Sequence, residues 1–157
     1  PLQWGGGQER GLRPGTLPVP LIIGFAKAAE MARSDLASRR QRLERLRNRL
    51  WEGLKQRQPT LLLNGDAIER LPHNLNITIP GISGSKLHRA LRSRVACSSG
   101  SACSRGEPSH VLMALGRSRQ EAEASLRLSL GRSTTEHEID QAIQAINDVI
   151  HQLRHKP

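Results

Sequence analysis

The feature that most constrains the fold is the last segment of the chain, from Thr135 to Leu153. Thr135 and Glu138 have the spacing of a capping box, in which the two residues satisfy each other's free backbone N–H groups at a helix start. Apolar side chains then repeat at intervals of four and three, at Ile139, Ile143, Ile146, Ile150 and Leu153. A helix with this stripe buries one face, so the chain must supply a layer for it to cover.

The segment from about Leu17 to Gln58 predicts a second, longer helix. Pro18 and Pro20 fit only in or before its first turn, and Pro59 ends it. Its apolar stripe runs through Ala26, Ala29, Ala32, Leu36, Leu43, Leu46, Leu50 and Leu54. The opposite face carries Arg39, Arg40, Arg42, Arg45, Arg47 and Arg49. A coiled coil would also fit this spacing, but we expect the stripe to be the inner face of a helix laid over a sheet.

Four short stretches predict strands. They are Thr60 to Asn64, Asn74 to Ile79, Val95 to Cys97 and Leu126 to Leu130. The second and the fourth alternate apolar and polar residues, which is typical of a strand with one buried face. Short helices are expected at 83–91, 108–115 and 118–124. We therefore predict an α+β fold: a small antiparallel or mixed sheet of about four short strands covered by helices, including a long N-terminal helix and a C-terminal helix.

Residues 1–16 have neither a helical nor a strand period and are rich in Gly, Pro and Arg. In isolation such a segment is a flexible tail ahead of a single domain at 17–157. Glycine also lets backbone N–H groups approach a phosphate, and an Arg or Thr side chain can complete the contact. Composition alone leaves both interpretations open.

A formal net charge of +10 points to an acidic partner. Aromatic residues make up only 2% of the chain, so bases would find few surfaces to stack on, and nucleic acid is the less favoured partner. The charge does not distinguish a solvated surface from a basic domain that docks on an acidic protein. No apolar run is long enough to span a membrane, so we expect a cytoplasmic domain in which Cys97 and Cys103 are free thiols.

Cys103 lies in a loop of small residues, and loops of this kind more often carry function than fill a core. A polar turn with an unused thiol would have the same composition. A thiol reacts as the thiolate, and an unperturbed pKa of about 8.5 leaves only a minor fraction ionised at neutral pH. Arg105 and Arg127 are the cations that could raise this fraction. His110 is the nearest candidate for a Cys–His pair, and its orientation in a predicted helix is open.

Three separated motifs resemble the NifS/IscS-type cysteine desulfurases. They are GGGQERGLRPGT at 5–16, SSGSAC at 98–103 followed by EPSHVL at 107–112, and LRLSLGRSTT at 126–135. The resemblance covers essentially the whole chain. It implies a homodimeric pyridoxal-phosphate enzyme of the aminotransferase class V fold that converts L-cysteine to L-alanine and a protein-bound persulfide. The persulfide would pass to acceptor or scaffold proteins for iron–sulfur cluster assembly or tRNA thiolation.

By matched position, the resemblance implies a role for three residues. Cys103 is similar to the nucleophile that attacks the substrate sulfur and carries it away. Arg127 is similar to the residue that binds the substrate carboxylate, a task suited to a planar, bidentate guanidinium. Thr16 is similar to the hydroxyl that reaches the cofactor phosphate across the dimer interface.

In this family a lysine in a large domain, upstream of the Gly-rich segment, holds the cofactor. The four lysines of this chain, Lys27, Lys55, Lys86 and Lys156, do not lie in the matching context. The chain therefore resembles the C-terminal small domain of such an enzyme, and we expect it to be inactive alone because the cofactor supplies the electron sink. The alternative is a non-catalytic basic docking or sulfur-acceptor module.

Overall fold

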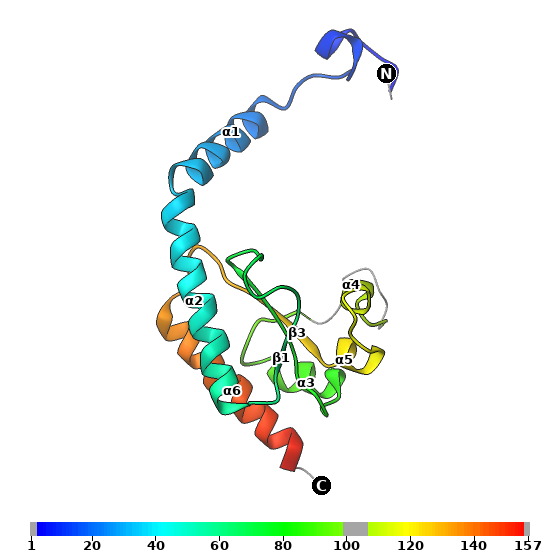
Figure 1. Ribbon diagram of the computed structural model, residues 1–157. Coiled ribbons are helices and arrows are strands. Elements are labelled where there is room, and N and C mark those ends of the chain that lie inside the picture. Colours follow the sequence, from blue (N-terminus) through cyan, green and yellow to red (C-terminus); the bar gives the residue numbers. More distant parts are fainter. Residues whose placement is uncertain (1–2, 99–106, 156–157) are drawn as a thin grey trace. The chain divides into compact units, whose positions relative to one another are not determined.

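A computed structural model describes residues 3–98 and 107–155 of the chain (Figure 1). The chain divides into two compact units, one at residues 1–37 and one at 38–157. The predicted domain boundary after residue 16 stays a prediction. No described helix combines the length and the apolar character that crossing a membrane requires.

The first unit contains a 3-10 turn at Gln8–Gly11 and helix α1 at Val19–Ser34. Pro20 lies in the first turn of α1, where its missing N–H costs no hydrogen bond. The prediction of one uninterrupted helix over 17–58 is wrong. Asp35 leaves the helical conformation, with φ −112° and ψ 11°, and α2 then begins and runs over Leu36–Arg57.

The second unit is built on a three-stranded antiparallel sheet, in the order β1-β2-β3. The strands are β1 at Leu62–Leu63, β2 at Asn74–Thr78 and β3 at Ser125–Ser129. The α+β class is confirmed, but the sheet has three strands, not about four. The stretch at 95–97 is not a strand, because the Val95 N–H still bonds to the Leu91 carbonyl of the preceding helical turn. In the part of this segment that the structure describes, up to Ser98, that residue alone pairs with the sheet, in an isolated bridge.

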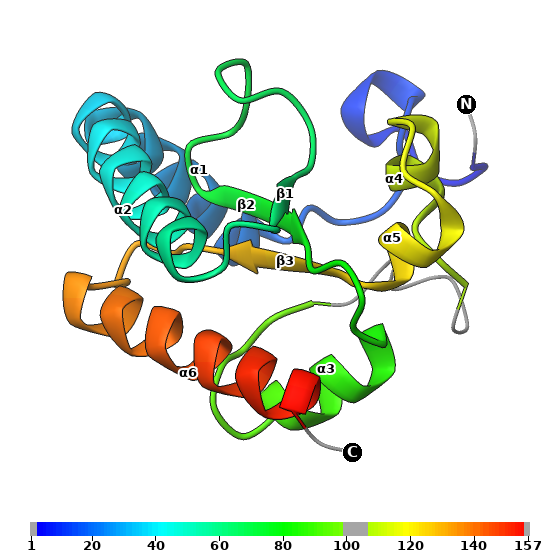
Figure 2. The same cartoon turned by 60° about the horizontal axis from the view of Figure 1, so that its bottom comes forward.

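The two faces of the sheet differ in chemistry. On the apolar face, Leu75 and Ile77 of β2 pair with Leu128 and Leu126 of β3. Helices α3 (Gly84–Leu91) and α6 (Glu136–His155) lie on the same side of the sheet (Figure 2). The core joins these strands to the leucines of α2 and α3 and to the isoleucines of α6; its largest fully buried members include Leu54, Leu61, Leu75, Ile77, Ile79, Leu87, Leu91, Leu126, Ile146 and Ile150.

Capping boxes begin two of the helices. In the predicted C-terminal helix, the Thr135 N–H donates to Glu138 Oε2 at 2.8 Å and the Glu138 N–H donates to Thr135 Oγ1 at 3.2 Å. Ser118 and Glu121 form the same arrangement at the start of α5, Arg119–Glu123. The short helix α4, His110–Ala114, precedes α5 in the chain and lies within the predicted range 108–115.

Two glycines allow close approach, Gly53 where α2 touches α6 and Gly84 where α3 begins. A Cβ on Gly53 would lie 2.5 Å from Cδ1 at the end of the Ile143 side chain of α6, which would have to shift. A Cβ on Gly84 would lie 1.8 Å from the backbone oxygen of Glu123, at the end of α5. Gly84 therefore lets α3 begin closer to the end of α5 than any other residue would allow.

Candidate functional site

The candidate site is the polar face of the sheet, and β3 presents Arg127 on it. Side chains alternate along β3, so Arg127 is exposed while Leu126 and Leu128 are buried on the other face. Asn76 of β2 is the residue directly opposite Arg127 in the antiparallel register. A rigid strand therefore fixes the backbone under this guanidinium, and its long side chain remains accessible to a ligand.

Ser98 pairs with Arg127 along the edge of β3 that does not face β2. The Ser98 N–H donates to the Arg127 carbonyl at 3.1 Å, and the Arg127 N–H donates to the Ser98 carbonyl at 3.0 Å. The Arg127 guanidinium also donates from Nη2 to Ser98 Oγ at 3.4 Å. The segment that leads to Cys103 thus starts directly beside Arg127.

Cys103 and Arg105 lie outside the described residues, but both flanks of their segment are described. On the far side, Glu107 forms an ion pair with Arg119 of α5, with 3.0 Å between Oε2 and Nη2. Cys103 is five positions after Ser98, and an extended chain of that length spans at most about 18 Å. The chain length therefore limits how far Cys103 can lie from Ser98.

Thr16 lies in the first unit, in the loop ahead of α1, and its side chain is exposed. Gly15 adopts a left-handed conformation with φ +100°, and its N–H donates to the Gln8 side chain at 3.2 Å. The Arg13 guanidinium donates to the Pro14 and Gly15 carbonyl groups. The Thr16 hydroxyl of this loop can contact a phosphate oxygen of pyridoxal phosphate. Further donors to that phosphate would have to come from other parts of the enzyme.

The other cysteine, Cys97, is half-buried, and burial raises the pKa of its thiol. Its Sγ lies 3.9 Å from Nδ1 of His88, and burial lowers the pKa of that imidazole. His88 Nε2 in turn lies 3.4 Å from the Ser125 carbonyl oxygen. A neutral thiol beside a neutral imidazole is a poor nucleophile, so we assign Cys97 no catalytic role. His110 is exposed at the start of α4.

A buried polar network lies on the same face and was not predicted from the sequence. Asn64 is its centre: its side-chain amide donates to Asn76 Oδ1, Thr78 Oγ1 and Ser125 Oγ at 2.8, 2.9 and 3.3 Å. Arg117 donates from Nε to Asn64 Oδ1 at 2.6 Å and from Nη2 to the Leu63 carbonyl at 2.7 Å. The network ties all three strands to the loop between α4 and α5. It therefore supports both Asn76, the neighbour of Arg127, and the element that holds Glu107.

Replacing Asn64 with Ala is expected to lower the free energy of unfolding by about 3 kcal/mol, because buried donors and acceptors lose their partner. Asn64 is only 4% exposed. The matched control is Asn74→Ala in β2, on the same face, which should cost within about 0.5 kcal/mol. Urea unfolding followed by circular dichroism measures both values. Equal losses in the two variants would show that the network contributes nothing specific.

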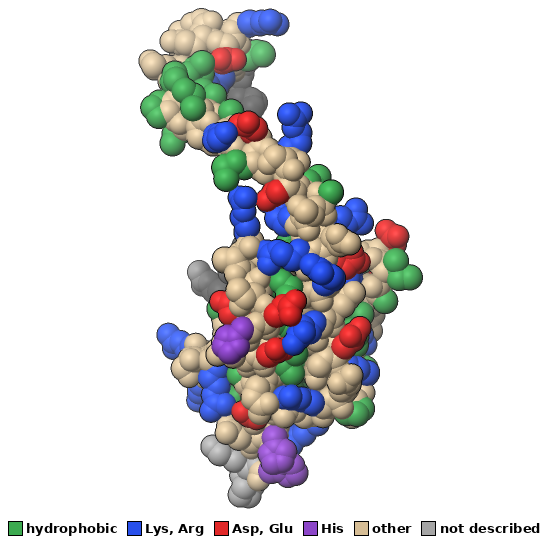
Figure 3. Space-filling model, turned by 90° about the vertical axis from the view of Figure 1, so that its left-hand side faces the viewer, with side chains coloured by type: hydrophobic (Ala, Val, Ile, Leu, Met, Phe, Trp, Pro, Cys, Tyr) green, Lys and Arg blue, Asp and Glu red, His purple; other side chains and the backbone are tan. Residues whose placement is uncertain are grey.

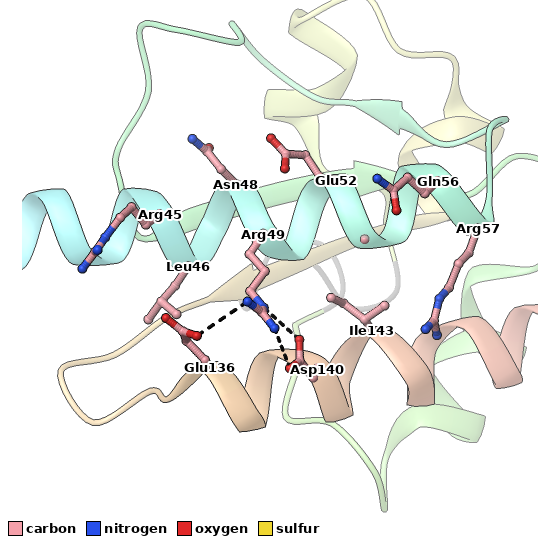
Figure 4. A pocket seen from close by; sticks show the side chains of 11 residues that line it. Arg45, Leu46, Asn48, Arg49, Glu52, Gln56, Arg57, Glu136, Asp140 and Ile143 are labelled. Carbon is pink, nitrogen blue, oxygen red and sulfur yellow. Dashed lines mark hydrogen bonds and ion pairs between the residues drawn. The ribbon is translucent and has the colours of Figure 1, made fainter.

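A separate groove of about 650 Å³ lies between α2 and α6. Basic and acidic side chains are intermixed on this side of the molecule (Figure 3). Arg49 spans the groove and donates to both Asp140 carboxylate oxygens, at 2.9 and 2.8 Å, with Glu136 beside it (Figure 4). The hydrogen bond from Arg49 lowers the pKa of Asp140. Arg49 in this groove is thus paired with two carboxylates, and the groove contains none of the predicted site residues. No group of metal-binding side chains occurs within the described ranges.

In a comparison with known proteins, the aminotransferase class-V family matches residues 4–142 of this chain. The chain therefore belongs to the class-V aminotransferase family.

Within that family, curated relatives named "Cysteine desulfurase IscS" are similar to it. The relatives from Shewanella baltica (strain OS155) and Aeromonas salmonicida (strain A449) are each 47% identical over 152 residues. These residues are 96% of this chain and 37% of each relative, so the chain spans little more than a third of their length. The predicted resemblance to NifS/IscS-type cysteine desulfurases is confirmed.

Solved structures agree with this assignment. A NifS-like protein superposes with a TM-score of 0.84 at 35% identity, covering 98% of this chain and 39% of the other. A NifS-like protein from Rickettsia africae gives 0.83 at 29% identity, covering 96% of this chain and 40% of that one.

Proposed function

We propose that this chain is the substrate-binding and sulfur-carrying part of a cysteine desulfurase, which converts L-cysteine to L-alanine and a persulfide on Cys103. The observation that carries the proposal is the pairing of Ser98 with Arg127, because it joins the start of the cysteine segment to a fixed, exposed guanidinium. A carboxylate of a small amino acid is a suitable ligand for such a guanidinium.

In the proposed reaction, Arg127 binds and orients the substrate carboxylate. The Cys103 thiolate attacks the substrate sulfur, an S–S bond forms, and the C–S bond of the substrate breaks. The electron pair stays with the substrate carbon, which takes up a proton to give alanine. A thiol of a sulfur-acceptor or scaffold protein then removes the outer sulfur, for iron–sulfur cluster assembly or tRNA thiolation.

Pyridoxal phosphate, when bound, supplies the electron sink for this chemistry. In the proposal Thr16 contacts its phosphate from the partner subunit of a cytoplasmic homodimer, and the lysine that holds the cofactor lies outside these 157 residues. Two of the lysines present have other tasks: Lys27 pairs with Glu30, and Lys55 donates to the Pro59 and Leu61 carbonyl groups. The isolated chain is then inactive.

The test is to incubate the natural gene product with L-cysteine and pyridoxal phosphate. We expect alanine and sulfane sulfur in equal amounts, and no alanine from the isolated 157 residues. Borohydride reduction of the isolated chain with pyridoxal phosphate should leave no covalently attached cofactor. A stoichiometric adduct would contradict an external lysine. Absence of alanine from the natural gene product would favour the alternative, a non-catalytic basic docking or sulfur-acceptor module.

A further inference from the structure

Helix α3 and the turn that follows it carry a cluster of exposed cations. We define the α3 basic surface as Lys86, Arg89, Arg92 and Arg94, all of which are exposed. The first three are spaced by three residues, so they follow one another along the outer face of the helix. The opposite face of α3 is buried in the core through Leu87 and Leu91.

The α3 basic surface lacks acidic residues in its own stretch of the sequence. No Asp or Glu occurs between Arg70 and Ser98. Within the described part of the chain, none of the four cations forms an ion pair or a side-chain hydrogen bond. The groove between α2 and α6 is different, since Arg49 there is matched by Glu136 and Asp140. Neighbouring like charges on a helix repel one another, so an acidic group from outside the chain would be favourable at α3.

The surface lies next to the candidate site. Arg94 is four residues ahead of Ser98, a separation of at most about 14 Å along the chain. Ser98 is hydrogen-bonded to Arg127 through both backbone groups. A partner bound on α3 is therefore close to the segment that leads to Cys103.

The chemistry of the surface favours an acidic protein over a nucleic acid. Trp51 is the last Phe, Tyr or Trp of the sequence, so none of these large aromatic side chains lies in or after α3 for a base to stack on. The helix is also short, at eight residues, and a compact cluster of cations matches a local acidic patch better than an extended phosphate backbone.

We propose that the α3 basic surface binds an acidic surface of a partner protein. That this partner is the sulfur acceptor rests on the proposed function. That α3 binds an acidic protein does not. Exposed charges at a protein interface raise the association rate and select the partner. Binding at the α3 basic surface should therefore weaken as the salt concentration rises.

The test uses a fluorescently labelled polyglutamate peptide as the acidic probe and measures its anisotropy with the full chain. The variant Lys86→Gln/Arg89→Gln/Arg92→Gln should bind the peptide about tenfold more weakly, since it lacks three exposed charge contacts. The matched control is Arg33→Gln/Arg40→Gln/Arg45→Gln, which removes the same charge from α1 and α2. Its affinity should stay within about twofold of the parent.

Three outcomes would overturn the proposal. Equal weakening in both variants would mean that only the net charge of the chain attracts the peptide. A larger loss for a single-stranded RNA than for the peptide would make α3 a nucleic-acid surface. The binding assay contains no cysteine and no cofactor, so its failure is separate from failure of the proposed reaction. With dithiothreitol as the sulfur acceptor, the α3 variant of the natural gene product should form alanine at the parental rate; a loss there would contradict a docking role.

Discussion

Replacing Cys103 with Ala is expected to abolish the sulfur that L-cysteine leaves on the natural gene product. Within these 157 residues Cys97 is the one other cysteine, and its half-buried thiol is a poor acceptor for the sulfur in the proposed reaction. Mass spectrometry of the intact protein, after a brief incubation with L-cysteine and alkylation, counts the bound sulfur atoms. We expect about one per chain in the parent and none in Cys103→Ala.

Cys97→Ala is the matched control, since it removes the other thiol of the chain. Burial raises the pKa of the Cys97 thiol and lowers the pKa of the neighbouring His88 imidazole, so at neutral pH neither group promotes thiolate formation at this position. Cys97→Ala should therefore keep the bound sulfur at the parental level. Sulfur that persists in Cys103→Ala, or that disappears in Cys97→Ala, would remove Cys103 from its proposed role.

Local patterns were sufficient for the elements whose stability is local. The capping box at Thr135 and the isoleucine repeat predicted α6 correctly because both signals act within one or two turns. The alternation in β2 and β3 predicted their buried faces for the same reason. The break at Asp35 was missed because the apolar stripe continues across it, and the geometry of one residue decides where the helix ends.

Nonlocal contacts decided what the sequence could not show. Asn64 was expected only as the last residue of a strand, yet it is buried and holds groups up to 61 residues away, including Ser125. Arg47 was placed on the solvated face of its helix, but it is 5% exposed and donates to the Leu71 carbonyl. Likewise, Val95 to Cys97 has the composition of a strand, but only Ser98 meets β3. No periodicity distinguishes these pairings before the chain has folded.

In the candidate site, too, local sequence patterns reveal some features and nonlocal contacts decide the others. A thiol on a loop and a cation on a strand could be found from composition and alternation, but their association required either the family resemblance or the structure. The Ser98–Arg127 bridge places the start of the cysteine segment beside Arg127, and its two backbone hydrogen bonds carry no side-chain signature. A Ser in this position predicts a turn as well as it predicts a bridge.

Arg127→Ala is expected to raise the KM of the natural gene product for L-cysteine by about a hundredfold. A hydrogen-bonded charge pair contributes about 1.5–3 kcal/mol, and each 1.4 kcal/mol is a factor of about ten in affinity. Because the interaction is with the carboxylate and not with the reacting sulfur, kcat should change far less than KM. Arg127→Lys should restore only part of the affinity, since an ammonium group cannot form the bidentate pair.

Ser129→Ala provides the control, because Ser129 is the next exposed residue on the same face of β3. It should leave KM and kcat at their parental values. The thermal unfolding midpoint of Arg127→Ala should also stay close to the parental one, since the Arg127 side chain is exposed and its backbone hydrogen bonds to Ser98 do not depend on the guanidinium. An unchanged KM in a folded Arg127→Ala protein would take this arginine out of the substrate site, and the Ser98 bridge would then be a purely structural connection.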